Sequence, residues 1–559
     1  MPDEEALAFL VNNDFSKSQY QAIRMNSLNH NSNVYPSYKK VRIAKNKCLP
    51  KNINISESNA NVPLQDLLDH TTARLLEVQE EVFLSQFQDS DIDLKGVLIS
   101  KWGFDGATGQ STYKQKHNPE TNPSPFYEDS IIFTSLVPLD LCINKKLIWR
   151  NPAPSSNRYC RPVELAYKKE TAESSLNLKT IIDNQISQLK PTLITIEDSD
   201  NDNKQLTVEI SHILQMTSVD GKVINAAVSN TSQQCCYLCG ATPKEMNAVN
   251  NYNKKVINKI PLSYGLSTLH ARIRCFEAIL HIAYRLKVKK WQIRGAKDKE
   301  ITAAEKLRIQ KEFRVKMGLV VDKPRAGGSG NSNDGNTARR AFKNITLFSQ
   351  ITNVDCELIK KLATILGVIT CGFEINSLKF AIYCKETLNL YVSLYPWFFM
   401  PVTLHKILVH GPVIVKRMCL PIGLFSEEAQ ERRNKDIKSY RLHHSRKDSR
   451  MHTIDDQFRT LLVTSDPMIS SKKNFTNKHK QSFSKEMIEL LDVEHNYIDE
   501  PLEVEEDTDD DNESNSSEIL EIEDDIVTSS VDNVDPPIDF YEDTFESDDN
   551  LDVHHFYRD

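Results

Sequence analysis

Apolar positions recur first at helical and then at strand spacing along the chain. Residues 62–87 place leucine, valine and phenylalanine at helical spacing, which predicts one long helix or two short ones. Short runs rich in apolar and β-branched residues predict strands at residues 96–104, 130–137, 146–149 and 205–216. A stretch of helical period, residues 171–189, precedes the last of these runs. Three strands, a helix and a further strand follow the order that a ribonuclease-H-like core needs.

No further strand is predicted soon after the strand at residues 205–216. Residues 226–420 instead predict a long, mostly helical insertion. Its expected helices lie at residues 266–286, 336–342, 357–366, 378–390 and 402–417. We therefore predict an α/β protein with a core over residues 95–225, which the insertion separates from C-terminal helices over residues 421–498.

Both ends of the chain are polar. Residues 1–60 are rich in asparagine and hold a basic cluster, residues 39–47, which suits a nuclear-import signal, a DNA-contacting arm or an ordinary solvated surface. Residues 61–94 form a helical lead-in that we expect to serve dimerisation or DNA binding. Residues 499–559 are acidic and poor in core-forming side chains, so this tail is predicted to stay disordered.

The formal charge of -8 hides a split between the acidic tail and the rest of the chain. The tail holds 25 Asp and Glu against one basic residue, Arg558, which leaves 68 basic and 52 acidic side chains elsewhere. An electropositive body suggests a polyanionic partner such as nucleic acid. Residues 285–325 carry fourteen Lys and Arg against five Asp and Glu, with Trp291 and Phe313 between the charges.

Cysteine usage and hydropathy exclude two classes of protein. Eleven cysteines are spread without a framework spacing and without a signal peptide ahead of them, which argues against a secreted disulfide scaffold. No apolar run reaches the ~18 residues needed to cross a bilayer. We therefore expect a soluble intracellular protein with no membrane partner.

Two pairs of side chains have the spacing of zinc ligands. Cys236 and Cys239 form a C-x-x-C, and His405 and His410 lie five positions apart. Each pair supplies half of a tetrahedral shell of two thiolates and two imidazoles. One structural Zn²⁺ bound by all four side chains would pin the two ends of the insertion together.

Acidic residues at predicted strand ends and on one helix suit a divalent-metal site. Asp105 ends the first strand and Asp220 follows the last, although an aspartate before glycine is usually a turn residue. Glu427, Glu428 and Glu431 form a helix-like cluster, which also fits a solvated face with basic neighbours. Phosphoryl transfer on DNA by two Mg²⁺ or Mn²⁺ ions needs carboxylates that converge from distant positions.

A glycine-rich loop, residues 327–340, is predicted to open the helix at residues 336–342. Its open backbone amides and two arginines suit a phosphate group. Taken alone, such a loop is more often a flexible connector.

Six stretches of the chain, in this order, resemble one family: the Transib-type DNA transposases and the catalytic core of the V(D)J recombinase large subunit. The stretches read FDGATGQSTYKQ from Phe104, VDGKV from Val219, CYLCGATPKEMN from Cys236, MGLVVDKPRAGGSGNSNDGNTARR from Met317, LHKILVH from Leu404 and IGLFSEEAQERRNK from Ile422. They fall within residues 95–470, which is most of the part predicted to fold.

The resemblance implies a D-D-E active site on a ribonuclease-H-like fold that a zinc-binding insertion interrupts. It makes Asp105 and Asp220 the two aspartates of the site. Glu431 becomes the glutamate, with Glu428 as a second acid in the same helix. His270 lies in a family-like segment and is interpreted as structural. The family's four zinc ligands match Cys236, Cys239, His405 and His410.

The resemblance also implies a reaction. Water nicks DNA at an element end, the freed 3′-hydroxyl attacks the opposite strand to leave a hairpin on the flanking DNA, and the excised end joins target DNA. The expected cofactors are two Mg²⁺ or Mn²⁺ ions per active site and one structural Zn²⁺. The expected partners are double-stranded DNA, at terminal inverted repeats and at the target, a second copy of the chain in a homodimer, and a possible accessory subunit. The expected location is the nucleus.

Two other hypotheses stay open. A domesticated or decayed transposase-derived protein would bind DNA or chromatin without cutting it. The lack of a RING-type zinc module and of a dedicated end-binding domain favours this alternative, since residues 1–60 hold at most a remnant of an end-binding region, whereas the complete triad speaks against it. The other hypothesis is a zinc-stabilised interaction protein with no role on DNA. It requires the basic charge and the triad to be incidental.

Overall fold

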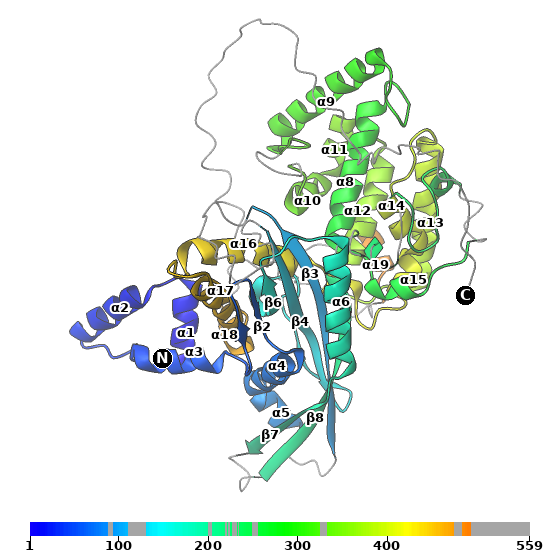
Figure 1. The fold of residues 1–559 in the computed structure, drawn as a ribbon. Helices are drawn as coiled ribbons and strands as arrows, with labels where there is room; N and C mark the ends of the chain where they lie inside the picture. The colour runs from blue at the N-terminus through cyan, green and yellow to red at the C-terminus, as the bar shows by residue number, and fades with distance from the viewer. Residues whose placement is uncertain are drawn as a thin grey trace, which may run out of the picture. The chain divides into compact units, whose positions relative to one another are not determined.

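A mixed sheet of eight strands lies at the centre of the computed structural model, within the residues that it describes (Figure 1). Those residues are 1–87, 93–109, 130–198, 204–218, 221, 224–225, 228, 232, 234–248, 255–324, 332–473 and 483–492. The strands are β1 (Asn54–Ile55), β2 (Asn59–Asn61), β3 (Leu94–Ala107), β4 (Ile131–Ile143), β5 (Lys146–Arg150), β6 (Arg161–Ala166), β7 (Thr192–Asp198) and β8 (Lys204–Ser218). Their order in the sheet is β1-β2-β6-β4-β3-β8-β7, with β5 paired to β4 beside this path.

The long strand β3 is the central strand that carries Asp105. It pairs antiparallel with β4 up to Ala107, which lies opposite Ile131. On its other side β3 runs parallel to β8, and Gly103 lies opposite Ser218. β4 is buried at nearly every position, as expected for a central strand that is covered on both faces. The predicted α/β class is confirmed by this mixture of a central sheet and many helices.

The predicted elements of the core mostly form, but one strand changes its role. The apolar stretch at residues 62–87 folds into two helices, α4 (Leu64–Val78) and α5 (Glu80–Phe87). The helix predicted at residues 171–189 is α6 (Ala172–Ser187). The predicted strand at residues 146–149 becomes β5, which pairs only with the end of β4. The sheet is extended from β4 by β6 instead. β6 escaped prediction because it begins with Arg161 and Pro162, an atypical start for a strand.

The part of the chain predicted as an insertion is mostly helical where it is described, and it packs around its own hydrophobic core. Its helices are α8 (Thr268–Arg285), α9 (Ala296–Met317), α10 (Gly335–Lys343), α11 (Ile345–Thr352), α12 (Cys356–Thr370), α13 (Ser377–Leu394), α14 (Val402–His405) and α15 (Gly411–Val415). After it come α16 (Glu428–His443), α17 (Arg450–Thr464), α18 (Pro467–Ser471) and α19 (Lys485–Glu489). None of the described helices has the length and apolar character that crossing a membrane requires.

Three helices occupy the N-terminal segment, for which the sequence pattern predicted no element. They are α1 (Asp3–Asn12), α2 (Lys17–Asn29) and α3 (Tyr38–Lys47). Ser16 and Gln19 form a capping box at the start of α2. Because the small core of this unit takes only a few apolar side chains from each helix, the segment is polar overall and its helices are hard to detect by hydrophobic period.

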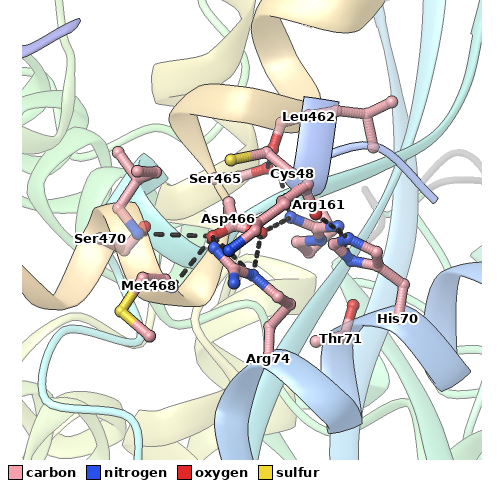
Figure 2. Close-up of polar contacts among 12 residues, drawn as sticks. Cys48, His70, Thr71, Arg74, Arg161, Leu462, Ser465, Asp466, Met468 and Ser470 are labelled. Atoms are coloured by element: carbon pink, nitrogen blue, oxygen red, sulfur yellow. Dashed lines mark hydrogen bonds and ion pairs between the residues drawn. The ribbon is translucent and has the colours of Figure 1, made fainter. Parts of the chain in front are cut away.

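A buried ion-pair network ties the N-terminal helices to the sheet (Figure 2). Arg74 of α4 donates to both carboxylate oxygens of Asp466, the residue that caps α18, over 2.9–3.2 Å. Arg161 of β6 lies 3.9 Å from the same carboxylate and donates to His70 Nδ1 at 3.0 Å. His70 Nε2 donates in turn to the carbonyl oxygen of Lys47, at the end of α3, at 2.9 Å. One buried carboxylate therefore connects elements that are far apart in the sequence.

Candidate metal centre and carboxylate site

The two cysteines predicted as zinc ligands belong to one tight turn. The amide of Gly240 donates to the carbonyl of Cys236 at 2.7 Å, and the amide of Cys236 donates to the carbonyl of Ala241 at 2.9 Å. Gly240 has a φ of 66°, a left-handed conformation that glycine adopts without strain. The turn therefore folds the chain back immediately after Cys239, so that the two thiols stay close to each other.

The two histidines come together because the chain between them is a π-helical turn. His405 ends α14, and Lys406–His410 form the π-helix η5. In an α-helix, residues five positions apart point about 140° away from each other. The wider i→i+5 turn reduces this angle and is common at functional sites. The two imidazole ring centroids lie 5.0 Å apart as a result.

The four side chains form one cluster. One ligand atom from each of Cys236, Cys239, His405 and His410 lies within 4.8 Å of all the others. The Cys239 Sγ is 3.3 Å from His405 Nε2, and neighbouring ligand atoms in a tetrahedral zinc shell would be about 3.3–3.8 Å apart. Among the described residues, neither ring nitrogen of the buried His410 has a hydrogen-bond partner. Buried polar atoms are normally satisfied, so the cluster fits a metal ion such as zinc.

The thiol pair has the electrostatics of a metal site. The hydrogen bond from Cys236 lowers the pKa of Cys239, against the effect of burial, and the neighbouring His405 and His410 lower it further. The same hydrogen bond raises the pKa of Cys236, and burial adds to the rise. One thiol of the pair therefore gives up its proton easily, and the thiolate is the form that binds metals.

Asp105 lies near the end of β3 and faces the helix α16. The side-chain amide Nδ2 of Asn434 donates to Asp105 Oδ2 at 2.9 Å. Glu431 lies one turn earlier on the same helix. The first aspartate and the glutamate of the predicted triad are therefore brought to one place in the fold.

Glu431 belongs to a concentrated group of negative charges. Although its side chain reaches the surface, loss of hydration among its neighbours raises the pKa of Glu431 to about 7. His270 opposes this rise, whereas the charges of Asp105, Glu427 and Glu428 add to it. Like charges at close range disfavour ionisation until a cation neutralises them, so the group suits a divalent ion.

Glu427 is buried, and the interpretation of the acidic cluster as a solvated face is wrong for this residue. Its Oε1 accepts hydrogen bonds from the hydroxyl of Ser267, from the amide of His270 at 3.2 Å and from His270 Nδ1 at 3.0 Å. Burial alone would lower the pKa of His270, but the hydrogen bond and the charge of Glu427 raise it to about 9. The pair joins α8 to the start of α16, which is a structural contact.

Glu428 faces two arginines from the mostly helical part of the chain, residues 226–420. Arg339 of α10 donates to Glu428 Oε1 at 3.3 Å, and Arg272 of α8 lies 3.9 Å from the same oxygen. Arg339 belongs to the glycine-rich loop predicted to bind phosphate, of which residues 327–331 lie outside the described residues. The described end of that loop therefore contacts the carboxylate group.

Asp220, the second aspartate of the predicted triad, lies outside the described residues. The strand that precedes it, β8, ends at Ser218, and Ser218 lies opposite Gly103. Gly103 is two residues before Asp105 on β3. The neighbouring strands that precede the two predicted aspartates thus run side by side and in the same direction up to this point.

Three residues that hold α16 against the sheet were not predicted. They are Lys101, Gln430 and Asn434, and none of them is an acid, a cysteine or a histidine, so a search for metal ligands passes over them. Spacing alone places two of them on the faces that carry the predicted acids. Asn434 follows Glu431 at helical period, and Lys101 precedes Asp105 by four positions on one strand face.

The basic stretch around α9 has basic side chains that are not used in internal ion pairs. Four of its five acids form internal ion pairs, among them Asp298 with Lys290 and Asp322 with Lys306. Exposed basic side chains beyond these pairs include Lys297, Lys299, Lys311 and Arg314 of α9. The aromatic residues between the charges are used inside the protein, because Phe313 is buried in the core and Trp291 packs on Phe399 at 4.8 Å between ring centroids.

No protein-family model and no curated protein matches this chain. Among solved structures, it is similar to a chain of the Drosophila P element transposase strand transfer complex, with 11% sequence identity and a TM-score of 0.28. The match covers 84% of this chain and 91% of that chain.

Proposed function

We propose that this chain is a metal-dependent DNA transposase or recombinase of the D-D-E type. The observation that carries the proposal is the contact between Asn434 and Asp105, which sets the helix of Glu431 against the end of the central strand. Two acids from distant parts of the sequence thereby join one group of negative charges. Carboxylates arranged in this way hold divalent cations for phosphoryl transfer. The resemblance of the surrounding motifs to the Transib-type transposases supports the same function.

A ribonuclease-H-like core, residues 95–225, is the proposed host of this site. In support, β6, β4 and β3 are antiparallel neighbours and β8 joins β3 in parallel. A helix, α6, lies between the antiparallel strands and β8 in the sequence, as a crossover to a parallel strand requires. In this proposal residues 226–420 are an insertion, and residues 421–498 return the chain to the core with the helix of Glu431.

Asp105, Asp220 and Glu431 are the proposed ligands of Mg²⁺ or Mn²⁺, with Glu428 beside them. Two bound cations would activate the attacking oxygen and stabilise the leaving oxygen. Other side chains of the protein compensate charge at this site and orient its carboxylates. Arg272 and Arg339 compensate part of the negative charge at Glu428. Asn434 holds the carboxylate of Asp105 in place.

The proposed reaction proceeds in two exchanges at phosphorus. Water first opens one phosphodiester at an element end and frees a 3′-hydroxyl. That hydroxyl then attacks the opposite strand, so that one phosphodiester replaces another and a hairpin forms on the flanking DNA. The excised end joins target DNA by the same kind of exchange. A covalent intermediate with the protein is not needed, and no serine or tyrosine is assigned as a nucleophile.

Zinc is the proposed occupant of the cysteine and histidine cluster. The donor set of two thiols and two imidazoles is that of a structural site, in which all four positions are taken by the protein. Cys239 and His405 are 166 positions apart, so the ion would join the start of the helical part to its end. The chain runs from His410 to α16, the helix that carries Glu431. A bound zinc ion that fixes His410 would therefore help to position Glu431.

Double-stranded DNA is the proposed partner, at terminal inverted repeats and at a target site. The exposed lysines and arginines of α9 are suited to phosphate contacts, so binding should weaken steeply as salt rises. Paired ends would be processed by a homodimer, with a possible accessory subunit. The nucleus is the proposed location.

Strand cleavage on a labelled duplex tests this function. The duplex spans the terminal repeat beside the gene of this protein, and the reaction is run with Mg²⁺ and with Mn²⁺. Nicks followed by hairpins are expected from the native chain and from Glu173→Gln, an exposed residue of α6 that serves as the control. Asp105→Asn and Glu431→Gln keep the shape of each side chain and should abolish both products.

The same experiment also identifies the alternative function. A native chain that carries zinc and binds the duplex, yet cuts it with neither cation, would be a DNA-binding protein derived from a transposase. Loss of cutting in Glu173→Gln as well as in the two site variants would show that the changes act through stability, and it would remove the assignment of Asp105 and Glu431.

A further inference from the structure

Lys101 and Asp105 project from the same face of β3. The pairing of β3 with its neighbours contains two register shifts, but the extra residue lies in β4 in one case and in β8 in the other. β3 itself is regular from residue 94 to residue 107, so side chains four positions apart share a face. Their Cα atoms are then about 13 Å apart along the strand.

Lys101 contacts the chain just before α16. Its side chain is completely buried, and its Nζ donates to the carbonyl oxygens of Leu424 at 3.0 Å, Ser426 at 2.5 Å and Pro154 at 2.8 Å. An ammonium group has three protons, and these acceptors use all of them. Burial lowers the pKa of Lys101 to about 8, against the charges of Cys160, Glu427 and Glu428. The group is thus mostly charged near neutral pH.

Asn434 contacts the other end of the same face. Its Nδ2 donates to Asp105 Oδ2 at 2.9 Å. One turn before it, Gln430 Nε2 donates to the carbonyl oxygen of Phe133 on β4 at 2.8 Å. Gln430 and Asn434 therefore set the rotation of α16, and Glu431 is left at the edge of the contact, close to Asp105.

The two contacts hold the chain at two separate points around the start of α16. Ser426 lies two residues before α16 begins, and Asn434 lies within that helix. On β3, Lys101 and Asp105 are about 13 Å apart along the strand. One contact alone would leave the start of α16 free to swing about it, whereas two separate contacts restrict its direction relative to β3.

We propose that Lys101 and Asn434 are a pair of positioning residues that set the separation of the Asp105 and Glu431 carboxylates. Neither residue needs to touch DNA or a cation for this role. The inference rests on the proposed function for its effect on catalysis. Its structural part, that the two contacts hold the segment 424–436 on β3, can be tested without metal or DNA.

Asn434→Leu is the main test, because leucine keeps the approximate shape of asparagine and removes the donor. Lys101→Met is the second variant, and Lys438→Met, an exposed lysine of α16, is the matched control. Each purified protein is first compared with the native chain for zinc content and for its unfolding midpoint. Amide hydrogen exchange is then measured across the chain, and Mn²⁺ binding is measured by calorimetry.

Asn434→Leu is expected to fold and retain its metal content, and to exchange faster in residues 424–436 with no change in α12 or α13. Its Mn²⁺ affinity should fall about 10–100-fold, the usual effect of removing a group that orients a metal ligand. Higher Mn²⁺ concentrations should restore part of the DNA cleavage. Lys101→Met should show the same pattern, and Lys438→Met should match the native protein.

Unchanged exchange in residues 424–436 together with unchanged Mn²⁺ affinity in a folded Asn434→Leu would overturn the inference. Should Lys101→Met fail to fold, the asparagine variant decides. A native chain that never cuts DNA would defeat the proposed function only, since the exchange of the segment 424–436 would still show whether the two contacts hold it.

Discussion

Asn434 donates a hydrogen bond to Asp105 at 2.9 Å, although 329 positions separate the two residues in the sequence. Asp105 belongs to the first long strand of the sheet and Asn434 to a helix that follows the whole helical part. The contact therefore requires the fold to bring the start of α16 back to the end of β3. A substitution far from the acidic group should therefore change the position of Glu431 whenever it moves the start of α16.

Gly423 offers the sharpest test of this dependence. A Cβ at Gly423 would lie 2.0 Å from the carbonyl oxygen of Cys371 and 2.6 Å from its carbonyl carbon. These are backbone atoms at the end of α12, which cannot rotate away. Gly423→Ala should therefore displace residues 422–425, lower the free energy of unfolding by about 1–3 kcal/mol in a denaturant titration, and reduce DNA cleavage.

Gly372→Ala is the matched control for this prediction. A Cβ at Gly372 would meet its nearest neighbour, the Cδ2 atom of Leu424, at an ordinary contact distance of 3.5 Å. The variant should keep most of the native stability. Equal losses in the two alanine variants would mean that the close approach at Gly423 does not decide the position of α16.

The sequence was most informative where chemistry limits the choice of residue. The C-x-x-C and H-x-x-x-x-H pairs predicted the cysteine and histidine cluster, because few residue types bind zinc and their spacing is recognisable. The π-helical turn that makes five-residue spacing work could not be predicted, since it depends on packing around His405 and His410.

The contacts of Lys101 and Asn434 were missed because lysine and asparagine occur in many surroundings and indicate no particular chemistry. A lysine in a strand and an asparagine in a basic helix fit a solvated surface equally well, and only the tertiary structure buries Lys101 or aims Asn434 at Asp105. The N-terminal helices were missed in the same way, because their core is completed by Val463 and Ile469 from the other end of the described chain.

Removing the metal from the cysteine and histidine cluster should destabilise the protein. Cys239→Ser should lose one zinc ion per chain, as measured by native mass spectrometry, and should unfold at a lower denaturant concentration, because metal binding contributes folding free energy. Cys356→Ser, at an exposed cysteine, is the control and should keep both properties. A Cys239→Ser protein that retains a full equivalent of zinc would contradict the assignment of the cluster.

The buried network at Asp466 should be sensitive to loss of its charge. Asp466 is fully buried, and Arg74 and Arg161 both face its carboxylate. Asp466→Asn keeps the size of the side chain but leaves two buried guanidinium groups without their counter-charge. We expect the free energy of unfolding to fall by about 3–5 kcal/mol, as measured by chemical denaturation.

An exposed ion pair provides the comparison for Asp466. Asp183 pairs with Lys179 on the surface of α6 at 2.5 Å, where solvent screens the charges. Asp183→Asn should change the free energy of unfolding by less than about 1 kcal/mol. Similar effects at Asp183 and Asp466 would show that the buried network does not tie the N-terminal helices to the core.

The ion pair of His270 and Glu427 should make stability depend on pH in a definite direction. The pKa of His270 is raised from 6.5 to about 9 in the folded chain, so the folded state holds a proton that the unfolded state releases. The stabilisation is therefore complete below about pH 6.5 and is lost as the pH rises through 9. On the acid side, the pKa of Glu427 is lowered from 4.5, because hydrogen bonds and the charge of His270 outweigh burial, so the pair also weakens when Glu427 takes up a proton.

A double-mutant cycle with His270→Gln and Glu427→Gln isolates this pair from the rest of the acidic group. Unfolding free energies of the native chain, the two single variants and the double variant are measured in chelator-free buffer without Mg²⁺ or Mn²⁺. The coupling between the two positions should be largest near pH 6 and should decline steadily towards pH 9.5. A coupling that is equally large at both pH values would mean that the contact is a neutral hydrogen bond, and the structural role of a charged His270 would have to be given up.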